Sequence, residues 1–287
     1  MKSSVDCSVL MLVENSDVDF SDYLVELHEH LNQLGLSHEL ILALNGPNDF
    51  AQTCLDKWPQ TGAEIIVLEL NRRVFSGICL QVALERCQGE VLVICGPYRQ
   101  VADDGLGSML QAIFENRADI ALPWRRNRVD PPINQLQSRL FNSVVHYLTG
   151  VKVHDLNCSL RVVRRAVLEE TVFHGDLYRF LPLMAKKRGF RTLEIPSSHI
   201  QEFGEIGYFG LRVYVNRLID LFAIHFNLHF SRKPLRYFGF RGGLILFVGL
   251  LLMLTAVVFR IAEGQHLGSS PQVMFGLILS LAGGGLW

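Results

Sequence analysis

The feature that most constrains this chain is an uncharged run near its C-terminal end. Residues 242–259 carry no charged side chain over 18 positions. A helix needs about 20 mostly apolar residues to cross the hydrocarbon core of a bilayer. A second uncharged run, 271–287, is shorter and rich in glycine. We expect both runs to be transmembrane helices, since paired core helices of a soluble fold rarely contain uncharged runs of this length.

The charges beside the first run predict its orientation. Four basic residues precede it: Arg232, Lys233, Arg236 and Arg241. The segment after it carries only Arg260 and Glu263 as charged residues before the second run begins. Because cytoplasmic flanks are enriched in Lys and Arg, we expect a multi-pass membrane protein with its large N-terminal domain in the cytoplasm. Residues 1–8 are polar and lack the apolar segment of a signal peptide.

The overall composition excludes some partners and does not indicate a metal site. The chain has 27 basic and 28 acidic side chains, so nothing in its charge points to a nucleic-acid partner. Its six cysteines form no C-x-x-C pair and have no zinc-ligand spacing. In a reducing compartment they are expected to be small buried apolar residues.

The first half alternates short apolar runs with segments of helical period. The expected strands are 8–13, 39–44, 65–70, 91–94 and 120–122. The expected helices between them are 24–34, 77–87 and 104–116. This order is typical of an α/β fold with a mostly parallel sheet and helices on both faces. Its ligands bind beyond the carboxyl ends of the strands, which places four segments around any site: 14–17, 45–48, 71–76 and 95–100.

The second half is expected to be mainly helical. Apolar residues of helical spacing share one face over 133–148, with Gly150 as the helix stop. A last strand is expected at 192–195. Aromatic and basic residues interleave over 208–230, which is typical of a helix lying in the membrane interface; an ordinary domain helix is the alternative. There, His225 and His229 are expected at headgroup level, although their i,i+4 spacing also suits a metal.

The pattern divides the chain into three parts. We expect an α/β domain over 1–207, interfacial amphipathic helices over 208–241 and two transmembrane helices over 242–287.

A motif in the middle of the chain carries a resemblance. The sequence reads Ser138-Arg139-Leu140-Phe141-Asn142, then Leu148-Thr149-Gly150, then Asp155-x-Asn157-Cys158-Ser159-Leu160-Arg161. This spacing resembles the family 2 glycosyltransferases that load sugars onto polyprenyl phosphates, the dolichyl-phosphate mannose synthase type. Later elements agree in order, including Gly189-Phe190 and Glu194-Ile195-Pro196.

The resemblance implies a GT-A-like domain that binds a nucleotide sugar through a divalent metal. The lipid phosphate would attack the anomeric carbon in one inverting displacement. Because that acceptor is already anionic, a general base is dispensable. The harder task is to neutralise the diphosphate leaving group, with a metal held on carboxylates and with basic side chains.

The sequence departs from the family where this neutralisation occurs. At the expected donor site, Glu14 follows the first strand, and Asn45 stands where the family has an Asp. Cys95-Gly96-Pro97 replaces the metal-binding D-x-D, so Cys95 and Pro97 line the site without a hard ligand. Cys95 could ligate a soft metal, but a lone Cys is more often packed. The late G-x-S-K segment is Gly204-Glu205-Ile206-Gly207, without its Lys.

Asp103 and Asp104 are the carboxylates that could have moved to replace the lost motif. Mg²⁺ or Mn²⁺ would bind only if one of them takes that role. The alternative is that both lie in the first turn of the next helix, where an acidic residue contributes about 1 kcal/mol.

The acceptor side keeps more of the family pattern. Arg125 and Arg126 follow the fifth expected strand, and Ser138 with Arg139 matches the acceptor motif. These four residues could hold a lipid phosphate, because Arg forms forked bonds to phosphate oxygens. The alternative is a solvated basic loop and one helix salt bridge. Asp155 and Arg161 are expected to form a structural ion pair or to belong to the site.

Three functions stay open at this point. The chain could be an active hexosyltransferase acting from a nucleotide sugar on a polyprenyl phosphate. It could be an inactive relative that docks, as a homo-oligomer or beside a partner membrane enzyme, as a scaffold or regulatory subunit. It could also be a module that binds a lipid phosphate without transfer.

Overall fold

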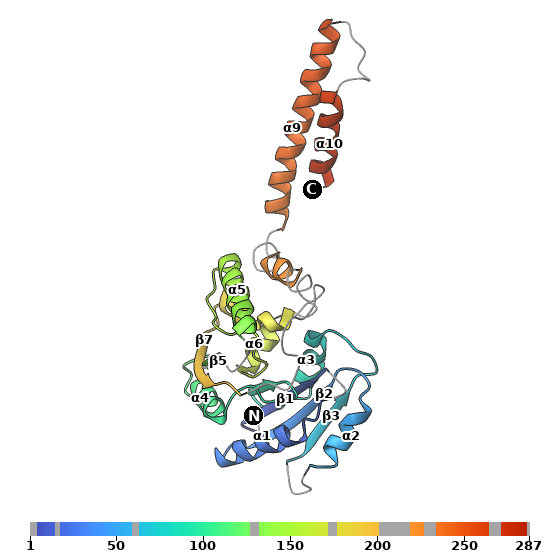
Figure 1. Cartoon of the computed structure of the whole chain (residues 1–287). Helices are drawn as coiled ribbons and strands as arrows, with labels where there is room; N and C mark the ends of the chain where they lie inside the picture. The colour runs from blue at the N-terminus through green and yellow to red at the C-terminus, as the bar shows by residue number, and fades with distance from the viewer. Residues whose placement is uncertain are drawn as a thin grey trace. The chain divides into compact units, whose positions relative to one another are not determined.

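The computed structural model describes residues 5–14, 18–58, 63–126, 132–171, 177–200, 219–226, 234–263 and 271–285. The chain forms two compact units, Met1–His225 and Phe226–Trp287. Figure 1 shows the sheet and its helices in the first unit and a helical pair in the second.

The first unit contains a seven-stranded sheet within the described residues. Its spatial order is β3-β2-β1-β4-β6-β5-β7. In chain order the strands are β1 Cys7–Val13, β2 His38–Leu44, β3 Ile65–Glu69, β4 Val91–Cys95, β5 Ile120–Arg126, β6 Arg161–Arg164 and β7 Thr192–Ser198. Only β6 runs antiparallel to its neighbours β4 and β5. The prediction of a mostly parallel α/β sheet is therefore confirmed.

Helices cover both faces of this sheet (Figure 1). Four helices alternate with the first five strands along the chain: α1 Ser21–Gln33, α2 Asp49–Leu55, α3 Ser76–Leu84 and α4 Asp103–Phe114. Alternate residues of β1, such as Val9 and Met11, pack into one core cluster with apolar residues of α1, α2 and α4. Successive strand residues point to opposite faces, so the intervening Leu10 faces the side on which α3 contacts β1 and β2. Both faces of β1 are thus buried.

The remaining elements of this unit are mostly short. They include α5 Pro132–Thr149, α6 Arg165–Glu170, the 3-10 turn η1 Leu177–Phe180 and α7 Leu181–Arg188. Residues 219–226 are also helical. The helix expected over 133–148 forms as α5, but its apolar face is not core. Ile133, Leu136 and Leu140 are 53%, 65% and 65% exposed. The buried residues described in α5 lie on its other side, and they are Ser138, Val145 and Thr149.

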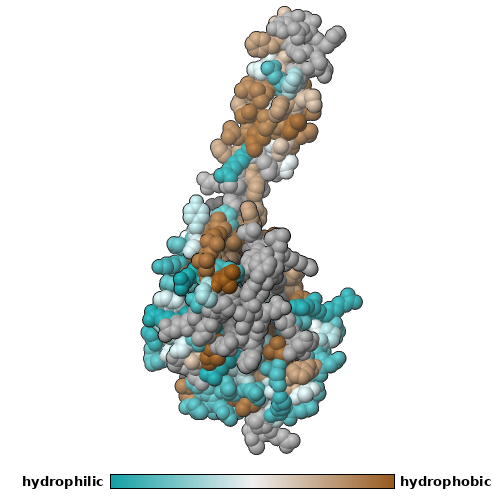
Figure 2. Space-filling model, viewed as in Figure 1, coloured by the Kyte–Doolittle hydropathy of each residue, from teal (hydrophilic) through white to brown (hydrophobic). Residues whose placement is uncertain are grey.

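In the part of the second unit that the structure describes, the two long elements are the helices α9 Pro234–Glu263 and α10 Pro271–Gly285. Within α9, Phe238–Phe259 is long and apolar enough to cross a membrane. Helix α10 has 15 residues, fewer than the roughly 20 that a span needs. Figure 2 shows hydrophobic side chains over both helices. The second predicted span stays a prediction, as do the domain boundaries.

Glycines let α9 and α10 approach backbone to backbone. A Cβ atom on Gly249 would lie 2.6 Å from Ser280 N, and one on Gly276 would lie 2.9 Å from Gly249 O. Small residues at a helix contact of this kind allow the close packing that stabilises helix pairs in lipid. A Cβ atom on Gly284, in the same helix as Gly276, would meet no other atom within 4 Å.

We expect Gly276→Leu to separate α9 from α10 and Gly284→Leu to leave the pair intact. The larger side chain meets Met253 and the backbone of Gly249, and overpacking of this kind costs about 1–3 kcal/mol. Amide hydrogen exchange of the full chain in detergent measures the effect, as faster exchange over α10 in Gly276→Leu alone. Equal exchange in both variants would contradict this packing.

Candidate functional site

The strand order places the candidate site at the carboxyl ends of β1 and β4. From β1 the chain moves to β2 and β3 on one side, then returns to β4 on the other. In open α/β sheets, ligands bind where the order reverses in this way. Segments that follow β1, β2, β3 and β4 meet at this edge because these strands are parallel. Residues 155–160 join them, since β6 starts beside the end of β4.

The tip of β2 holds the loop that follows β3. Asn45 Nδ2 donates to the carbonyl of Val74 at 2.8 Å, and Val74 N donates to Asn45 Oδ1 at 2.8 Å. Gly46 has a φ of +106°, and a Cβ there would lie 3.3 Å from Arg73 N. Asn45 therefore positions a loop, and Gly46 permits its close approach. The sequence placed 71–76 at this edge but gave its side chains no role; the loop exposes Arg72, Arg73 and Phe75.

Glu14, at the end of β1, forms a hydrogen bond with another part of the site. Its carboxylate accepts a hydrogen bond from Ser76 Oγ, at the first residue of α3. A carboxylate at a helix N-terminus is stabilised by the helix dipole. Glu14 thus links the end of β1 to α3.

The end of β4 provides no hard oxygen ligand from a side chain. Cys95 is fully buried, and burial raises the pKa of its thiol to about 12, so it stays neutral. Gly96 packs against Ser159, whose Oγ would lie 3.3 Å from a Cβ at this position. Pro97 is buried and has no ligand atom in its side chain. Asp103 and Asp104 begin α4, but their side chains lie outside the described part of the structure.

The described residues therefore do not fit a Mg²⁺ or Mn²⁺ site. They contain no group of three or more His, Cys, Asp or Glu side chains that could hold a metal ion. The role considered for Asp103 and Asp104 stays an untested prediction.

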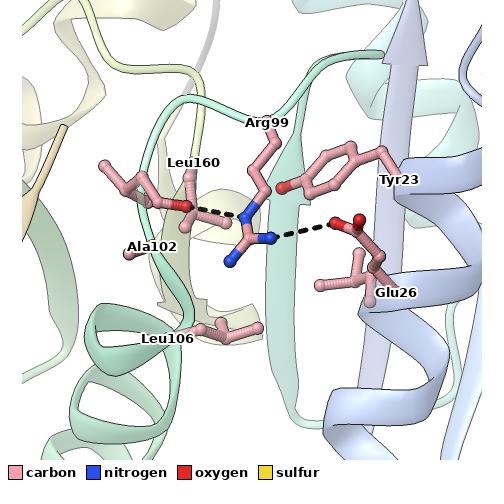
Figure 3. Close-up of a pocket in the computed structure, with 8 residues that line it drawn as sticks. Tyr23, Glu26, Arg99, Ala102, Leu106 and Leu160 are labelled. Atoms are coloured by element: carbon pink, nitrogen blue, oxygen red, sulfur yellow. Dashed lines mark hydrogen bonds and ion pairs between the residues drawn. The ribbon is translucent and has the colours of Figure 1, made fainter. Parts of the chain in front are cut away.

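Arg99 belongs to the segment after β4, and its side chain lies between α1 and α4 (Figure 3). Its Nε donates to the carbonyl of Val101 at 3.1 Å and its Nη1 to Glu26 at 3.0 Å. Tyr23, Leu106 and Leu160 line the same small pocket. The guanidinium fixes the segment after β4 against α1.

A buried ion pair forms the other side of the site. Arg125 Nε and Nη2 donate to the two carboxylate oxygens of Asp155 at 2.5 and 3.0 Å, and both side chains are 3% exposed. His199 Nε2 lies 3.5 Å from Arg125 Nη1. Beside this pair, Gln100 Oε1 accepts hydrogen bonds from Ser159 N and Oγ at 2.7 and 2.9 Å. This polar cluster ties β5 to the segments before β6 and after β7.

Two expectations for these residues are wrong. Arg125 and Arg126 lie within β5 rather than after it, because β5 extends to Arg126. The burial of Arg125 also excludes the alternative of a solvated loop for that residue. Asp155 pairs with Arg125 and not with Arg161. Arg161 instead donates to the carbonyls of Tyr178, Leu156 and Arg179, and burial lowers the pKa of its guanidinium.

The four residues expected at the acceptor phosphate differ in burial and in direction. Successive residues of a strand point to opposite sides, so Arg126 points away from the buried Arg125. Its guanidinium carbon lies 4.4 Å from the ring centre of Trp124, which stacks on His154 at 4.2 Å. On α5, Ser138 is buried and Arg139 is exposed. Arg126 and Arg139 are the exposed cations among the four.

Comparison with known proteins decides the family. Residues 8–172, more than half of the chain, match Glycosyl transferase family 2.

The chain belongs to this family.

Similar curated proteins extend the likeness beyond the family domain. The dodecaprenyl-phosphate galacturonate synthase of Rhizobium johnstonii is 24% identical over 248 residues, which cover 85% of this chain and 73% of that protein. The undecaprenyl-phosphate 4-deoxy-4-formamido-L-arabinose transferase of Pseudomonas fluorescens is 25% identical over 280 residues, 96% of this chain and 80% of its own. Both relatives are sugar transferases of polyprenyl phosphates by name.

Solved structures support the fold. The glucosyl-3-phosphoglycerate synthase of Mycobacterium tuberculosis, in complex with Mn²⁺, UDP and phosphoglyceric acid, superposes with a TM-score of 0.57. The alignment covers 78% of each chain at 11% sequence identity. The mannosyl-3-phosphoglycerate synthase of Rubrobacter xylanophilus gives a TM-score of 0.53 at 14% identity, covering 77% of this chain and 73% of its own. At these identities the likeness concerns the fold alone.

We expect Asp155→Asn to destabilise this family 2 domain strongly. The change leaves the Arg125 charge buried without a counter-charge, which costs about 3–5 kcal/mol. The matched control is Glu169→Gln, which removes the exposed partner of Arg165 and costs at most about 1 kcal/mol. Urea unfolding of the full chain in detergent, followed by tryptophan fluorescence, measures both. Equal midpoints for the two variants would show that the Arg125–Asp155 pair contributes little.

Proposed function

We propose that this protein is a membrane-anchored family 2 glycosyltransferase that transfers a sugar, of the hexose class, from a nucleotide sugar to a polyprenyl phosphate. The observation that carries the proposal is the extent of the likeness. Relatives named as polyprenyl-phosphate sugar transferases align over 85% and 96% of this chain. The family domain alone ends at residue 172.

The proposed reaction is a single displacement. An oxygen of the lipid phosphate forms a bond to the anomeric carbon, and the bond from that carbon to the diphosphate oxygen breaks. The electron pair leaves with the nucleoside diphosphate. The attacking phosphate is anionic at neutral pH, so no side chain has to remove a proton.

The chain's own residues would bind and orient the two phosphates. Arg126 and Arg139 are exposed guanidinium groups on the acceptor side, and each can donate two parallel hydrogen bonds to a phosphate. The cation–π contact with Trp124 restricts the positions that Arg126 can adopt. The buried Arg125–Asp155 pair would act indirectly, by holding β5 in place.

A membrane-spanning helix would hold the domain near the bilayer that contains the lipid acceptor. A polyprenyl chain stays in the bilayer, so its phosphate is reached at the surface. The apolar part of α9, Phe238–Phe259, suits a span of that bilayer. The basic residues before it favour a cytoplasmic site for the domain. Two spans and interfacial helices over 208–241 belong to this proposal.

A second candidate function rests on the end of β4. Cys95, Gly96 and Pro97 provide no metal ligand, which favours a non-catalytic member of the family. Such a protein would bind a lipid phosphate without transfer, or serve as a scaffold or regulatory subunit in a homo-oligomer or beside a partner membrane enzyme.

Transfer in nanodiscs that contain undecaprenyl phosphate tests the proposal. The full chain is incubated with radiolabelled UDP- and GDP-sugars, and the lipid extract is counted. We expect label in the lipid for at least one donor. A charge-assisted hydrogen bond contributes about 1.5–3 kcal/mol, so Arg126→Ala should reduce the rate about 10- to 100-fold.

The matched control is Arg86→Ala, which removes another exposed arginine. Arg86 follows α3 at the opposite edge of the sheet from the site, and its loss should leave transfer unchanged. Lipid binding without transfer from any donor would favour the second candidate.

A further inference from the structure

We infer that this protein binds its nucleotide donor without a divalent cation, and that Arg72 and Arg73 supply the positive charge at the diphosphate. The inference rests on the proposed function only for the class of ligand, a nucleoside diphosphate. The placement of the two arginines rests on contacts within the described residues.

First, the side chains at the tips of β1 and β4 are poor ligands for a divalent cation. Mg²⁺ and Mn²⁺ bind hard oxygen ligands, usually carboxylates. At the tip of β4 the side chains offer a neutral buried thiol and a proline. At the tip of β1, the carboxylate of Glu14 accepts a hydrogen bond from Ser76. A diphosphate at this edge would still require neutralisation, because its oxygens carry several charges close together.

The second step is the rigidity of the loop that carries the two arginines. The paired hydrogen bonds between Asn45 and Val74, each 2.8 Å long, fix the loop to the tip of β2. The backbone of Arg73 packs against Gly46, where a side chain would intrude. A loop held at both points presents Arg72 and Arg73 with little loss of backbone entropy on binding.

The third step is the reach of these side chains. Neighbouring strands lie about 4.8 Å apart, so the tip of β2 is about 10 Å from the tip of β4 across β1. The long side chain of an arginine and a diphosphate group can together bridge that gap. Both guanidinium groups are exposed, and no described carboxylate forms an ion pair with either. They are therefore available to an anionic ligand.

The fourth step is the residue that ends the loop. Phe75 is 57% exposed and lies immediately before α3. An exposed aromatic ring offers a surface on which a nucleobase can stack. Cations for a diphosphate and a ring for a base thus occur in one five-residue loop, 71–75, which fits a nucleoside diphosphate better than an inorganic anion.

Calorimetry of the full chain in nanodiscs, with UDP and GDP as probes, tests the inference. Each probe is titrated in excess EDTA and again with Mg²⁺ or Mn²⁺. We expect one of the two nucleotides to bind with the same affinity in all three solutions. The double variant Arg72→Ala/Arg73→Ala should bind it at least about tenfold more weakly, since it loses charge-assisted hydrogen bonds.

Two further variants separate charge from folding and from stacking. Arg86→Ala, an exposed arginine away from the site, should bind as the wild type does. Phe75→Ala should weaken the diphosphate and the matching monophosphate by the same factor, because both keep the base. The double arginine variant should weaken the diphosphate more than the monophosphate. Circular dichroism of each variant checks that the fold is retained.

Nucleotide affinity that appears only with Mg²⁺ or Mn²⁺ would overturn the inference, as would an absence of binding in every solution or an equal loss in Arg86→Ala. Metal-dependent binding together with lipid transfer would end the inference and keep the proposed function. Metal-free binding without transfer would keep the inference and end the proposed function.

Discussion

The parallel pairing of β1 with β2 on one side and β4 on the other determines where this protein can bind a ligand. Val13 pairs with Leu44, and Met11 pairs with Cys95. The residues that follow these strands consequently meet at one edge, although they are about 30 to 80 positions apart in the chain. Glu14, Asn45 and Gly96 are neighbours for this reason alone. A change of register would move every one of them.

The polar residues at that edge serve mainly to hold segments in place. Asn45 holds the 71–75 loop, Glu14 reaches the start of α3, and Gln100 holds Ser159. The Arg125–Asp155 pair adds a buried ion pair to these contacts. Buried pairs gain little over apolar packing but are costly to break, so the pair fixes one arrangement of β5 against the segment before β6.

The sequence predicted the elements that have strong local patterns. The apolar runs of β1, β2, β3 and β4 place each strand to within one residue at either end. Strand β6 was missed because it has two apolar residues between arginines and runs antiparallel. The helix over α5 was predicted, but spacing does not say which face is buried, and its apolar stripe is exposed.

The site was harder to predict because its contacts join distant residues. Arg125 and Asp155 are 30 positions apart, and nothing in the motif indicates that Asp155 pairs with Arg125 rather than Arg161. The inferred role of Arg72 and Arg73 in binding a diphosphate depends on the hydrogen bonds between Asn45 and Val74, which hold their loop at the tip of β2. By contrast, the sequence alone shows that Cys95 and Pro97 stand where the family has carboxylates. The described residues contain no group of three or more His, Cys, Asp or Glu side chains that could hold a metal instead.

Metal-free binding of a nucleotide is the property that we infer for this family 2 glycosyltransferase domain. The decisive experiment is a crystal structure grown with UDP or GDP and Mn²⁺, in which the anomalous signal of manganese is measured. We expect nucleotide density at the carboxyl ends of β1 and β4, with the diphosphate on the 71–75 loop and no manganese peak beside it. A manganese peak between the diphosphate and Asp103 or Asp104 would show instead that nucleotide binding depends on a metal.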